Sequence, residues 1–566
     1  INLSLSDFFG SSPKTVMRDN TINKVYPDKS YRTDLFEKYL KNVLSLESVA
    51  CKDWLTNKVD RCVTGKVAKQ QCVGSLQLPL NNCGVMALDY SGRNGVATSI
   101  GHAPIPALIN PKAGSRIAIG KALTNIIWAP LEKNLLSVTL SANWMWPCNN
   151  PGEDARLYEA VESCSDFAIG LGINIPTGKD SLSMKQKYND KEVISPGTVI
   201  ISAAANCNNI SNIIEPVFQP NNQNIYYINL ANNNFNIGGS AFSQTLDFIG
   251  SSTIDSCDAS YFKKTFNVFQ NLIKENLISS GHDISSGGLI TTILEMCFSE
   301  NNIGANIDLN QFKEKDLIRL LFSESLGIVF QGKTEIEEVL NTNNINFINI
   351  GKVSNNSKLG LKSNSNNIII DISKYRDIWF KTSYLLDQKQ SGKIKAKERF
   401  ENFKKHPLNF KFPNNFNGKI NHHNTKKVNA AVIREKGSNS EREMAYAMTL
   451  AGFEVKDVHM TDLISGRENL EDINFIVAVG GFSNSDVLGS AKGWAGSFLY
   501  NEKAKKSLMN FYKRENTLSL GVCNGCQLFV ELGLLHPEHE IKPKMDHNDS
   551  NKFECIFTSV EIQKND

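Results

Sequence analysis

The chain has no apolar run of the roughly 18–20 residues that a membrane-spanning helix needs, and no signal peptide opens it. It also has no strong excess of charge, because 61 basic and 58 acidic residues leave a formal charge of +3. A balance this small gives no reason to expect nucleic acid or a membrane as a partner.

A disulfide framework is absent as well. The 12 cysteines are scattered along 566 residues, which fits reduced thiols in the cytoplasm. The chain is too long for one hydrophobic core and fits about three to four domains. It begins at Ile1 and ends within a domain pattern, so we interpret it as a fragment of a longer protein.

One strand–turn–helix signal stands out, in Gly521-Val-Cys-Asn-Gly-Cys-Gln527. The apolar run Thr517–Leu520 predicts a strand, and the two glycines allow a tight turn around Cys523. A thiol at a helix N-terminus is favoured as the thiolate. The amide of Asn524, which follows, can donate to a developing oxyanion. This pattern is typical of a nucleophile that attacks an amide carbonyl.

Two other interpretations of this region are open. Cys523 and Cys526 also fit a redox or zinc Cys-x-x-Cys motif, although no second cysteine pair lies near, and we expect Cys526 to pack. His536-Pro-Glu538 has the His-x-Glu form of a catalytic triad. A helix leaving Cys523 would, however, carry His536 roughly 15 Å away, at about 1.5 Å per residue. We expect His536 to follow the end of that helix.

Strand-like and helical patterns alternate along the rest of the chain. Helices are predicted over Tyr31–Leu46, Leu44–Lys58, Glu153–Leu171, Gly288–Phe298 and Glu441–Leu450. Residues 388–426 are charged and lack periodicity, which predicts a linker. The alternating unit that follows predicts a parallel sheet with its ligand site at the carboxyl ends of the strands, where Cys523 lies.

Three segments in the middle of the chain carry further signals. Gly178–Met184 is interpreted as a polar turn with a lysine that meets phosphate. Gly281–Gly288 opens a helix, so its N–H groups and Asp283 could hold phosphate and metal together. Lys121 and Asn125 lie one turn apart on one helix face. Each signal alone is weak, since the Ser-Ser-Gly-Gly run fits a simple helix cap equally well.

Together these motifs carry a family resemblance. The spacing Gly-x-Cys-x-Gly-x-Gln resembles the class I glutamine amidotransferases, in which the amide of Gly481 would be the second oxyanion donor. The order of Asp60–Gly65, Gly120–Asn125, Asn143–Pro147 and the segments above resembles the single-chain phosphoribosylformylglycinamidine synthases. The resemblance runs through nearly the whole chain but covers only the back part of those enzymes.

That resemblance implies a glutamine-dependent carbon–nitrogen ligase of purine biosynthesis. It would use ATP and Mg²⁺ to convert formylglycinamide ribonucleotide to formylglycinamidine ribonucleotide, with glutamine hydrolysed at Cys523. The implied site residues are Cys523, Gly481 and Asn524 for catalysis, Asn81 and Ser285 for nucleotide, and Asn82, Asn125 and Asp283 for metal. Relatives carry acidic residues where this chain has Asn82 and Lys121. We hypothesise that Lys121 replaces one cation by reaching a phosphate; the alternative is that it is solvated and a metal is lost.

The resemblance also implies a multi-domain α/β fold that ends in an incomplete flavodoxin-like glutaminase. The expected parts are a helical segment (1–65), an ATP-binding synthetase domain (66–210), a synthetase C-terminal-type domain (222–387), the linker (388–426) and the glutaminase (427–566). The family's triad His and Glu would lie beyond residue 566, so the fragment by itself is expected to be inactive, and the full-length protein to be a monomer. The rival functions are a stand-alone glutamine hydrolase and a truncated, non-catalytic binding module.

Overall fold

The computed structural model describes residues 2–10, 16, 18–22, 24–90, 92–363, 367–409, 414–415, 428–558 and 563–564. The chain divides into two compact units. Unit 1 comprises Ile1–Asn409 and Lys552–Asp566, and unit 2 comprises Phe410–Asn551. Within the described residues, no helix is both long enough and apolar enough to cross a membrane.

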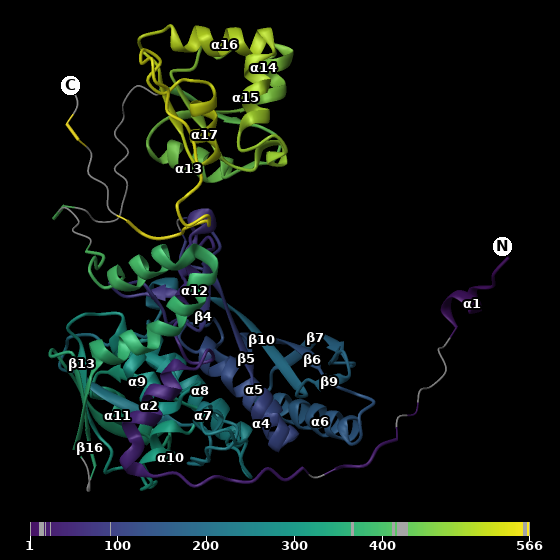
Figure 1. Ribbon diagram of the computed structural model, residues 1–566, viewed down its shortest axis with the longest axis vertical. Helices are drawn as coiled ribbons and strands as arrows, with labels where there is room; N and C mark the ends of the chain where they lie inside the picture. Colours follow the sequence, from purple (N-terminus) through teal and green to yellow (C-terminus); the bar gives the residue numbers. More distant parts are fainter. Residues whose placement is uncertain are drawn as a thin grey trace. The chain divides into compact units, whose positions relative to one another are not determined.

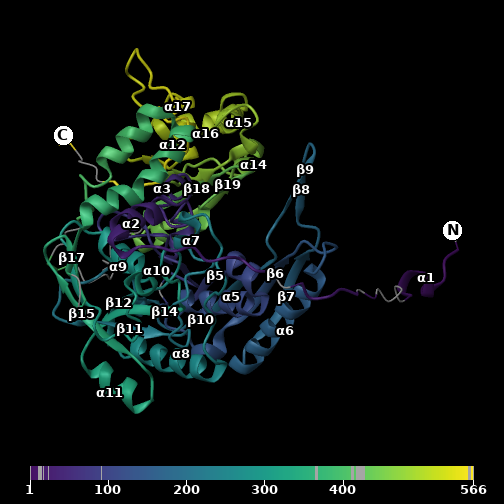
Figure 2. The same cartoon turned by 60° about the horizontal axis from the view of Figure 1, so that its bottom comes forward.

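The first sheet of unit 1 has six strands in the order β1-β4-β5-β10-β6-β7. All neighbours pair antiparallel except β6 and β7, which are parallel. Helices α5 and α6 pack against one another, and α5 also lies along β5 and β10 (Figure 1). A separate hairpin, β8–β9, projects from this part of unit 1 (Figure 2). The bounds are β1 Val67–Lys69, β4 Cys83–Ala87, β5 Gly95–His102, β6 Thr139–Met145, β7 Asn174–Ser181, β8 Lys185–Tyr188, β9 Lys191–Ile194, β10 Thr198–Cys207, α4 Pro104–Ile109, α5 Pro111–Ile126 and α6 Glu153–Leu171.

The second sheet of unit 1 has seven strands in the order β12-β14-β11-β15-β13-β16-β17. It is antiparallel except between β13 and β16. The bounds are β11 Asn224–Asn229, β12 Ile278–Asp283, β13 Gly304–Asp308, β14 Gly327–Gly332, β15 Ile348–Ser354, β16 Lys358–Lys362, β17 Asn367–Asp371, α2 Phe36–Ser45, α3 Asp53–Thr56, α7 Ala241–Thr245, α8 Ala259–Lys274, α9 Gly288–Phe298, α10 Leu317–Phe322, α11 Glu335–Thr342 and α12 Ile372–Asn402.

Strand β11 separates two hydrophobic cores. Because side chains alternate along a strand, Tyr226 and Ile228 enter a core shared with α5, α6 and α8. Ile225 and Tyr227 enter the opposite core, with α2, α9 and α12. The first of these cores also contains residues of the six-stranded sheet, so the two sheets of unit 1 share it.

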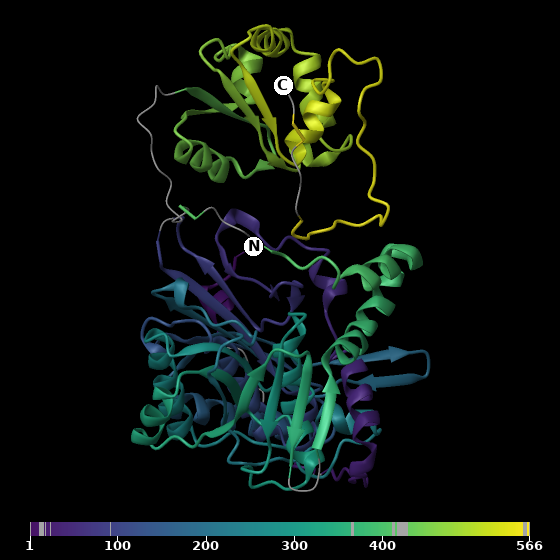
Figure 3. The same cartoon turned by 90° about the vertical axis from the view of Figure 1, so that its left-hand side faces the viewer.

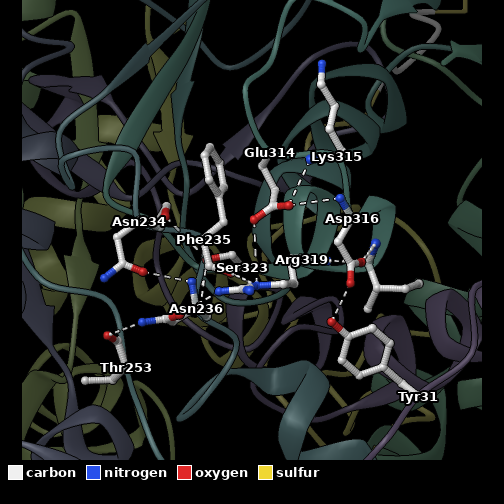
Figure 4. Close-up of polar contacts among 12 residues, drawn as sticks. Tyr31, Asn234, Phe235, Asn236, Thr253, Glu314, Lys315, Asp316, Arg319 and Ser323 are labelled. Carbon is white, nitrogen blue, oxygen red and sulfur yellow. Dashed lines mark hydrogen bonds and ion pairs between the residues drawn. The ribbon is translucent and has the colours of Figure 1, made fainter. Parts of the chain in front are cut away.

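A polar network joins the N-terminal segment to helix α10 and to the chain after β11 (Figure 4). Tyr31 donates through its hydroxyl to Asp316 at 2.6 Å, and Asp316 caps the N-terminus of α10 by accepting from the backbone of Ile318 and Arg319. The Arg319 guanidinium donates to Asn236 Oδ1 at 2.7 Å. The network joins three segments that are distant in sequence.

Unit 2 is a four-stranded, all-parallel sheet in the order β20-β18-β21-β23 (Figure 3). That order, 2-1-3-4 along the chain, is flavodoxin-like. Helix α13 packs on one face and α14 to α17 on the other, so the predicted parallel α/β unit is confirmed. The bounds are β18 Asn429–Arg434, β19 Ser438–Asn439, β20 Glu454–His459, β21 Phe475–Ala478, β22 Gly480–Gly481, β23 Leu518–Gly521, α13 Glu441–Leu450, α14 Met460–Ser465, α15 Lys492–Leu499, α16 Glu502–Tyr512 and α17 Asn524–Glu531.

One sequence-based prediction was wrong here, and a second segment has more local structure than its sequence pattern indicates. The helix predicted over Leu44–Lys58 is reduced to one turn, Asp53–Thr56. The linker predicted over 388–426 is helical through Asn402, because α12 resumes after a break at Gly392. Arg399 in this part binds the buried carboxylate of Asp53 at 2.8 and 3.1 Å, which anchors the helix. Most of residues 410–426 lies outside the described residues.

Candidate active sites

The turn after β23 is a strained elbow at Cys523. The strand ends at Gly521, Cys523 adopts φ 55° and ψ −113°, and α17 begins at Asn524. A cysteine at positive φ is strained, and such strain persists only where surrounding structure enforces it. Cys523 is exposed and occupies the N-cap position of the helix, where its thiol makes no capping hydrogen bond. The strand–turn–helix predicted from the sequence is therefore present.

Close packing of glycine backbones holds this elbow. A Cβ on Gly525 would lie 2.0 Å from the carbonyl oxygen of Ala478, so only glycine fits beneath the turn. A Cβ on Gly480 would lie 3.3 Å from Cys523 Cβ and 3.6 Å from its Sγ. The Gly480–Gly481 strand therefore runs beside the thiol, and Gly481, at φ 103°, occupies a conformation suited to glycine.

Asn524 links the elbow to the Gly-Gly segment. Its side chain is buried, accepts a hydrogen bond from Ser483 Oγ at 2.7 Å and donates to Gln527 Oε1 at 3.3 Å. Its backbone N–H is the first of α17 and has no intrahelical acceptor. The three predicted catalytic residues, Cys523, Gly481 and Asn524, thus lie together.

The His-x-Glu segment does not join this group. Helix α17 ends at Glu531, and both His536 and Glu538 are exposed. His536 contacts His539, with ring centroids 5.1 Å apart. Among the described residues, no histidine hydrogen-bonds to the Cys523 thiol.

A cleft of about 1060 Å³ in unit 1 forms the second candidate site. The strands β4, β5, β6 and β10, helix α5 and the loop just before α9 contribute to its walls. Of the nucleotide and metal residues expected from the sequence, Asn81, Asn82, Asn125 and Ser285 line it. Residues separated by more than 200 positions in sequence thus meet in one place.

Asp283, the fifth expected residue, lies directly behind Asn82. The Asn82 side-chain amide donates to Asp283 Oδ1 at 2.9 Å. Asp283 is 2% exposed and also contacts His282 Nδ1 at 3.1 Å, while His282 Nε2 lies 3.2 Å from Glu295. Burial would lower the pKa of His282, but the two carboxylates outweigh it and raise the pKa to about 9. The Asp283 carboxylate therefore has the positively charged imidazole of His282 beside it.

Several polar atoms in the cleft walls are buried and have no hydrogen-bond partner. They are Arg61 Nε and Nη1, Thr64 Oγ1, Gln70 Oε1, Asn81 Oδ1 and Asn125 Oδ1. Buried polar atoms are normally paired, so their concentration around one cleft indicates a place for a polar ligand. The side-chain amide oxygens of Asn82 and Asn125 are hard donors of the type that Mg²⁺ accepts, and the Asp283 carboxylate lies directly behind Asn82. The donor set therefore fits a Mg²⁺ ion that takes its other ligands from water or phosphate.

Lys121 also lines the cleft and is only partly exposed. Its Nζ lies 3.8 Å from Glu324 Oε2. The other carboxylate oxygen of Glu324 accepts from the backbone N–H groups of Ala241 and Gly287, at 2.8 and 3.0 Å. The ammonium is thus held at the cleft wall, facing the same space as Asn125.

The prediction of a polar turn over Gly178–Met184 was wrong. Two residues that line the cleft were also missed by the sequence-based prediction. Residues up to Ser181 belong to strand β7, which pairs with β6, and the Lys179 ammonium donates to Asp180 O instead of facing the cleft. Arg61 and His102 line the cleft without having been predicted. The motif Asp60–Gly65 was a signal for Arg61; an isolated His102 offers none.

Three family models match the chain. The FGAR-AT PurM_N-like domain matches residues 51–206, the C-terminal domain of AIR synthase related proteins matches 228–364, and the CobB/CobQ-like glutamine amidotransferase domain matches 427–566.

Curated relatives cover nearly the whole chain. It is 39% identical to the probable phosphoribosylformylglycinamidine synthase, chloroplastic/mitochondrial, of Arabidopsis thaliana, over 100% of this chain and 41% of that protein. Identity is 37% to the Dictyostelium discoideum phosphoribosylformylglycinamidine synthase (98% and 45%) and 36% to the Homo sapiens protein (92% and 41%). The chain thus spans less than half the length of these relatives. A solved structure titled T. maritima PurL complexed with ATP matches with a TM-score of 0.44 and 14% identity, over 61% of this chain and 52% of that one.

Proposed function

Because this chain is homologous over its whole length to the phosphoribosylformylglycinamidine synthases, we propose that it carries out part of their reaction. In that reaction, formylglycinamide ribonucleotide, glutamine and ATP give formylglycinamidine ribonucleotide. Unit 2 hydrolyses glutamine, and the cleft of unit 1 binds the nucleotide. The observation that carries the proposal is the Cys523 elbow with Gly480 and Gly481 beside its thiol.

In unit 2, the Cys523 thiolate attacks the side-chain carbonyl of glutamine. Negative charge then develops on the carbonyl oxygen, where the amides of Gly481 and Asn524 donate to it. Ammonia leaves, and water hydrolyses the thioester on Cys523.

In unit 1, the cleft residues hold and orient ATP and its metal. Asp283, Asn82 and Asn125 would hold Mg²⁺, with Asn81 and Ser285 near the nucleotide. A bound Mg²⁺ would neutralise charge on the polyphosphate during phosphoryl transfer to the substrate amide. Lys121, whose ammonium lies 3.8 Å from Glu324 at the same wall, would contact a phosphate, as hypothesised from the sequence.

A glutamine hydrolase that serves another synthetase is the second candidate. The cleft argues against it, because the buried, unpaired polar atoms of unit 1 need a ligand of their own. We further propose that the full-length protein is a cytoplasmic monomer.

The test is ATP hydrolysis by the full-length protein in the presence of formylglycinamide ribonucleotide, with glutamine or ammonia as nitrogen donor. The proposal expects ATP turnover that depends on the ribonucleotide with either donor, and a Cys523→Ala variant that retains only the ammonia-dependent reaction. Glutamine hydrolysis without any ribonucleotide-dependent ATP turnover would favour the second candidate.

A further inference from the structure

The loop after the Gly-Gly strand is tied to the helix after the cysteine by one buried hydrogen bond. Ser483 Oγ donates to Asn524 Oδ1 at 2.7 Å, across 41 residues of sequence. Both residues are 1% exposed. Ser483 is two residues from Gly481, and Asn524 directly follows Cys523. The bond therefore connects the two segments that carry the proposed oxyanion donors.

The loop that carries Ser483 is strained. Asn484, Ser485 and Asp486 have φ values of 51°, 56° and 52°, in the left-handed region that non-glycine residues avoid. Consecutive residues in this region persist only when surrounding contacts hold them. Two of these contacts are backbone bonds, from Phe482 to Gly437 at 2.9 Å and from Asn484 to Lys436 at 2.7 Å. The Ser483–Asn524 bond is the one that reaches the elbow.

We infer that Ser483 and the Asn524 side chain are positioning residues for the oxyanion hole. Their hydrogen bond fixes the Gly481 amide relative to the Asn524 amide, so that both donors address one oxygen. Without it, the strained loop can relax and carry Gly481 away from the thiol. This inference rests on the proposed function, because the hydrogen bond can position oxyanion donors only if Cys523 attacks a carbonyl.

A merely structural role would affect folding and leave the chemistry of the thiol unchanged. Two probes separate these roles. An aldehyde analogue of glutamine adds reversibly to Cys523: the S–C bond forms, the carbonyl π electrons move to oxygen, and that oxygen takes a proton from water. The adduct oxygen occupies the hole. Iodoacetamide alkylates the same thiol by displacing iodide and forms no oxyanion, so it reports thiol reactivity alone.

Both reactions are measured on the parent chain and on the Ser483→Ala and Ser483→Thr variants. Thermal unfolding first shows that each variant is folded. We expect Ser483→Ala to bind the aldehyde at least tenfold more weakly, with alkylation at Cys523 unchanged within twofold. Ser483→Thr retains the hydroxyl and should restore aldehyde binding. If Ser483→Ala does not fold, Ser483→Cys takes its place. Its thiol is a weak hydrogen-bond donor, so we expect the same loss of aldehyde binding with unchanged alkylation at Cys523.

Equal aldehyde affinity in a folded variant without the hydroxyl would overturn the inference. Parallel losses in aldehyde binding and alkylation would overturn it too, because they indicate a general collapse of the elbow. A parent chain that binds no aldehyde at Cys523 would instead contradict the proposed function, and the two failures are thereby distinguished.

Discussion

The side chains of Asn82 and Asp283 are joined by a 2.9 Å hydrogen bond across 201 residues of sequence. This bond joins the residue before β4, which lines the cleft, to the last residue of β12. Asp283 is a buried carboxylate, and Asn82 presents an amide where the family resemblance implies a second carboxylate. At position 82 the proposed metal site therefore carries one negative charge fewer than that resemblance implies.

Asn82→Asp should convert this pair into two adjacent carboxylates. Without metal they repel each other and the charged hydrogen bond is lost, so we expect unit 1 to lose about 1.5–3 kcal/mol of stability in a chelator. Mg²⁺ relieves the repulsion and should raise the melting temperature of the variant more than that of the parent. Scanning calorimetry with and without Mg²⁺ measures this difference, with Asn82→Leu as the control that gains no metal ligand. An identical Mg²⁺ response in all three proteins would rule out a metal at Asp283.

Lys121→Met should weaken ATP binding about tenfold, a loss of about 1.4 kcal/mol, because it removes a fixed positive charge from the cleft wall. Lys121→Glu should add a ligand and raise the number of Mg²⁺ ions bound with ATP by one. Titration calorimetry and equilibrium dialysis measure the two quantities. Lys133→Met, at an exposed position outside the cleft lining, is the matched control. Unchanged ATP affinity in Lys121→Met would show that this ammonium does not contact phosphate.

Gly525→Ala should destabilise unit 2 by about 3 kcal/mol or more, because the added Cβ would lie 2.0 Å from the backbone oxygen of Ala478. The comparison is Gly533→Ala, at φ 66° with no atom within 4 Å of its Cβ, which should cost only about 1–2 kcal/mol of backbone strain. Urea unfolding of both variants gives the two values. Similar losses would mean that the elbow is not closely packed.

Arg399→Met tests the long-range contact that anchors the end of α12. It leaves the buried carboxylate of Asp53 without its guanidinium partner. Removing one partner of a fully buried ion pair lowers the stability of a protein by about 3–5 kcal/mol. Because the Arg399 side chain is about a third exposed, we expect a smaller loss of stability, about 2–3 kcal/mol. Lys397→Met, which removes an exposed pair with Glu401, should cost less than about 0.5 kcal/mol. A loss of similar size in both variants would argue against the anchoring role.

Local patterns predicted much of this architecture. The helices Glu153–Leu171, Gly288–Phe298 and Glu441–Leu450 have the bounds that their periodicity indicates. The turn at Cys523 follows from its flanking glycines, which permit tight packing. These features depend on residues close in sequence, so sequence patterns could reveal them.

The features that the sequence did not reveal depend on distant contacts. The end of α12 is polar and suggests a linker, but it is helical where Arg399 reaches Asp53 and Phe403 stacks on Phe380 at 4.0 Å. Strand β7 is exposed, yet β-pairing with β6 recruits it into the sheet. The place of Arg61 in the cleft lining likewise arises only when β-strands and loops from separate segments meet.

Covalent labelling by a chloroketone analogue of glutamine tests the central claim, that Cys523 is a glutamine-directed nucleophile. Near neutral pH we expect the analogue to modify Cys523, glutamine to protect it, and Cys523→Ser to abolish labelling. Cys62 is also exposed and should react with iodoacetamide but not with the analogue. Burial raises the pKa of Cys164 to about 12, so this thiol should react with neither. Modification of Cys62 in preference to Cys523, or labelling that glutamine does not slow, would contradict the account.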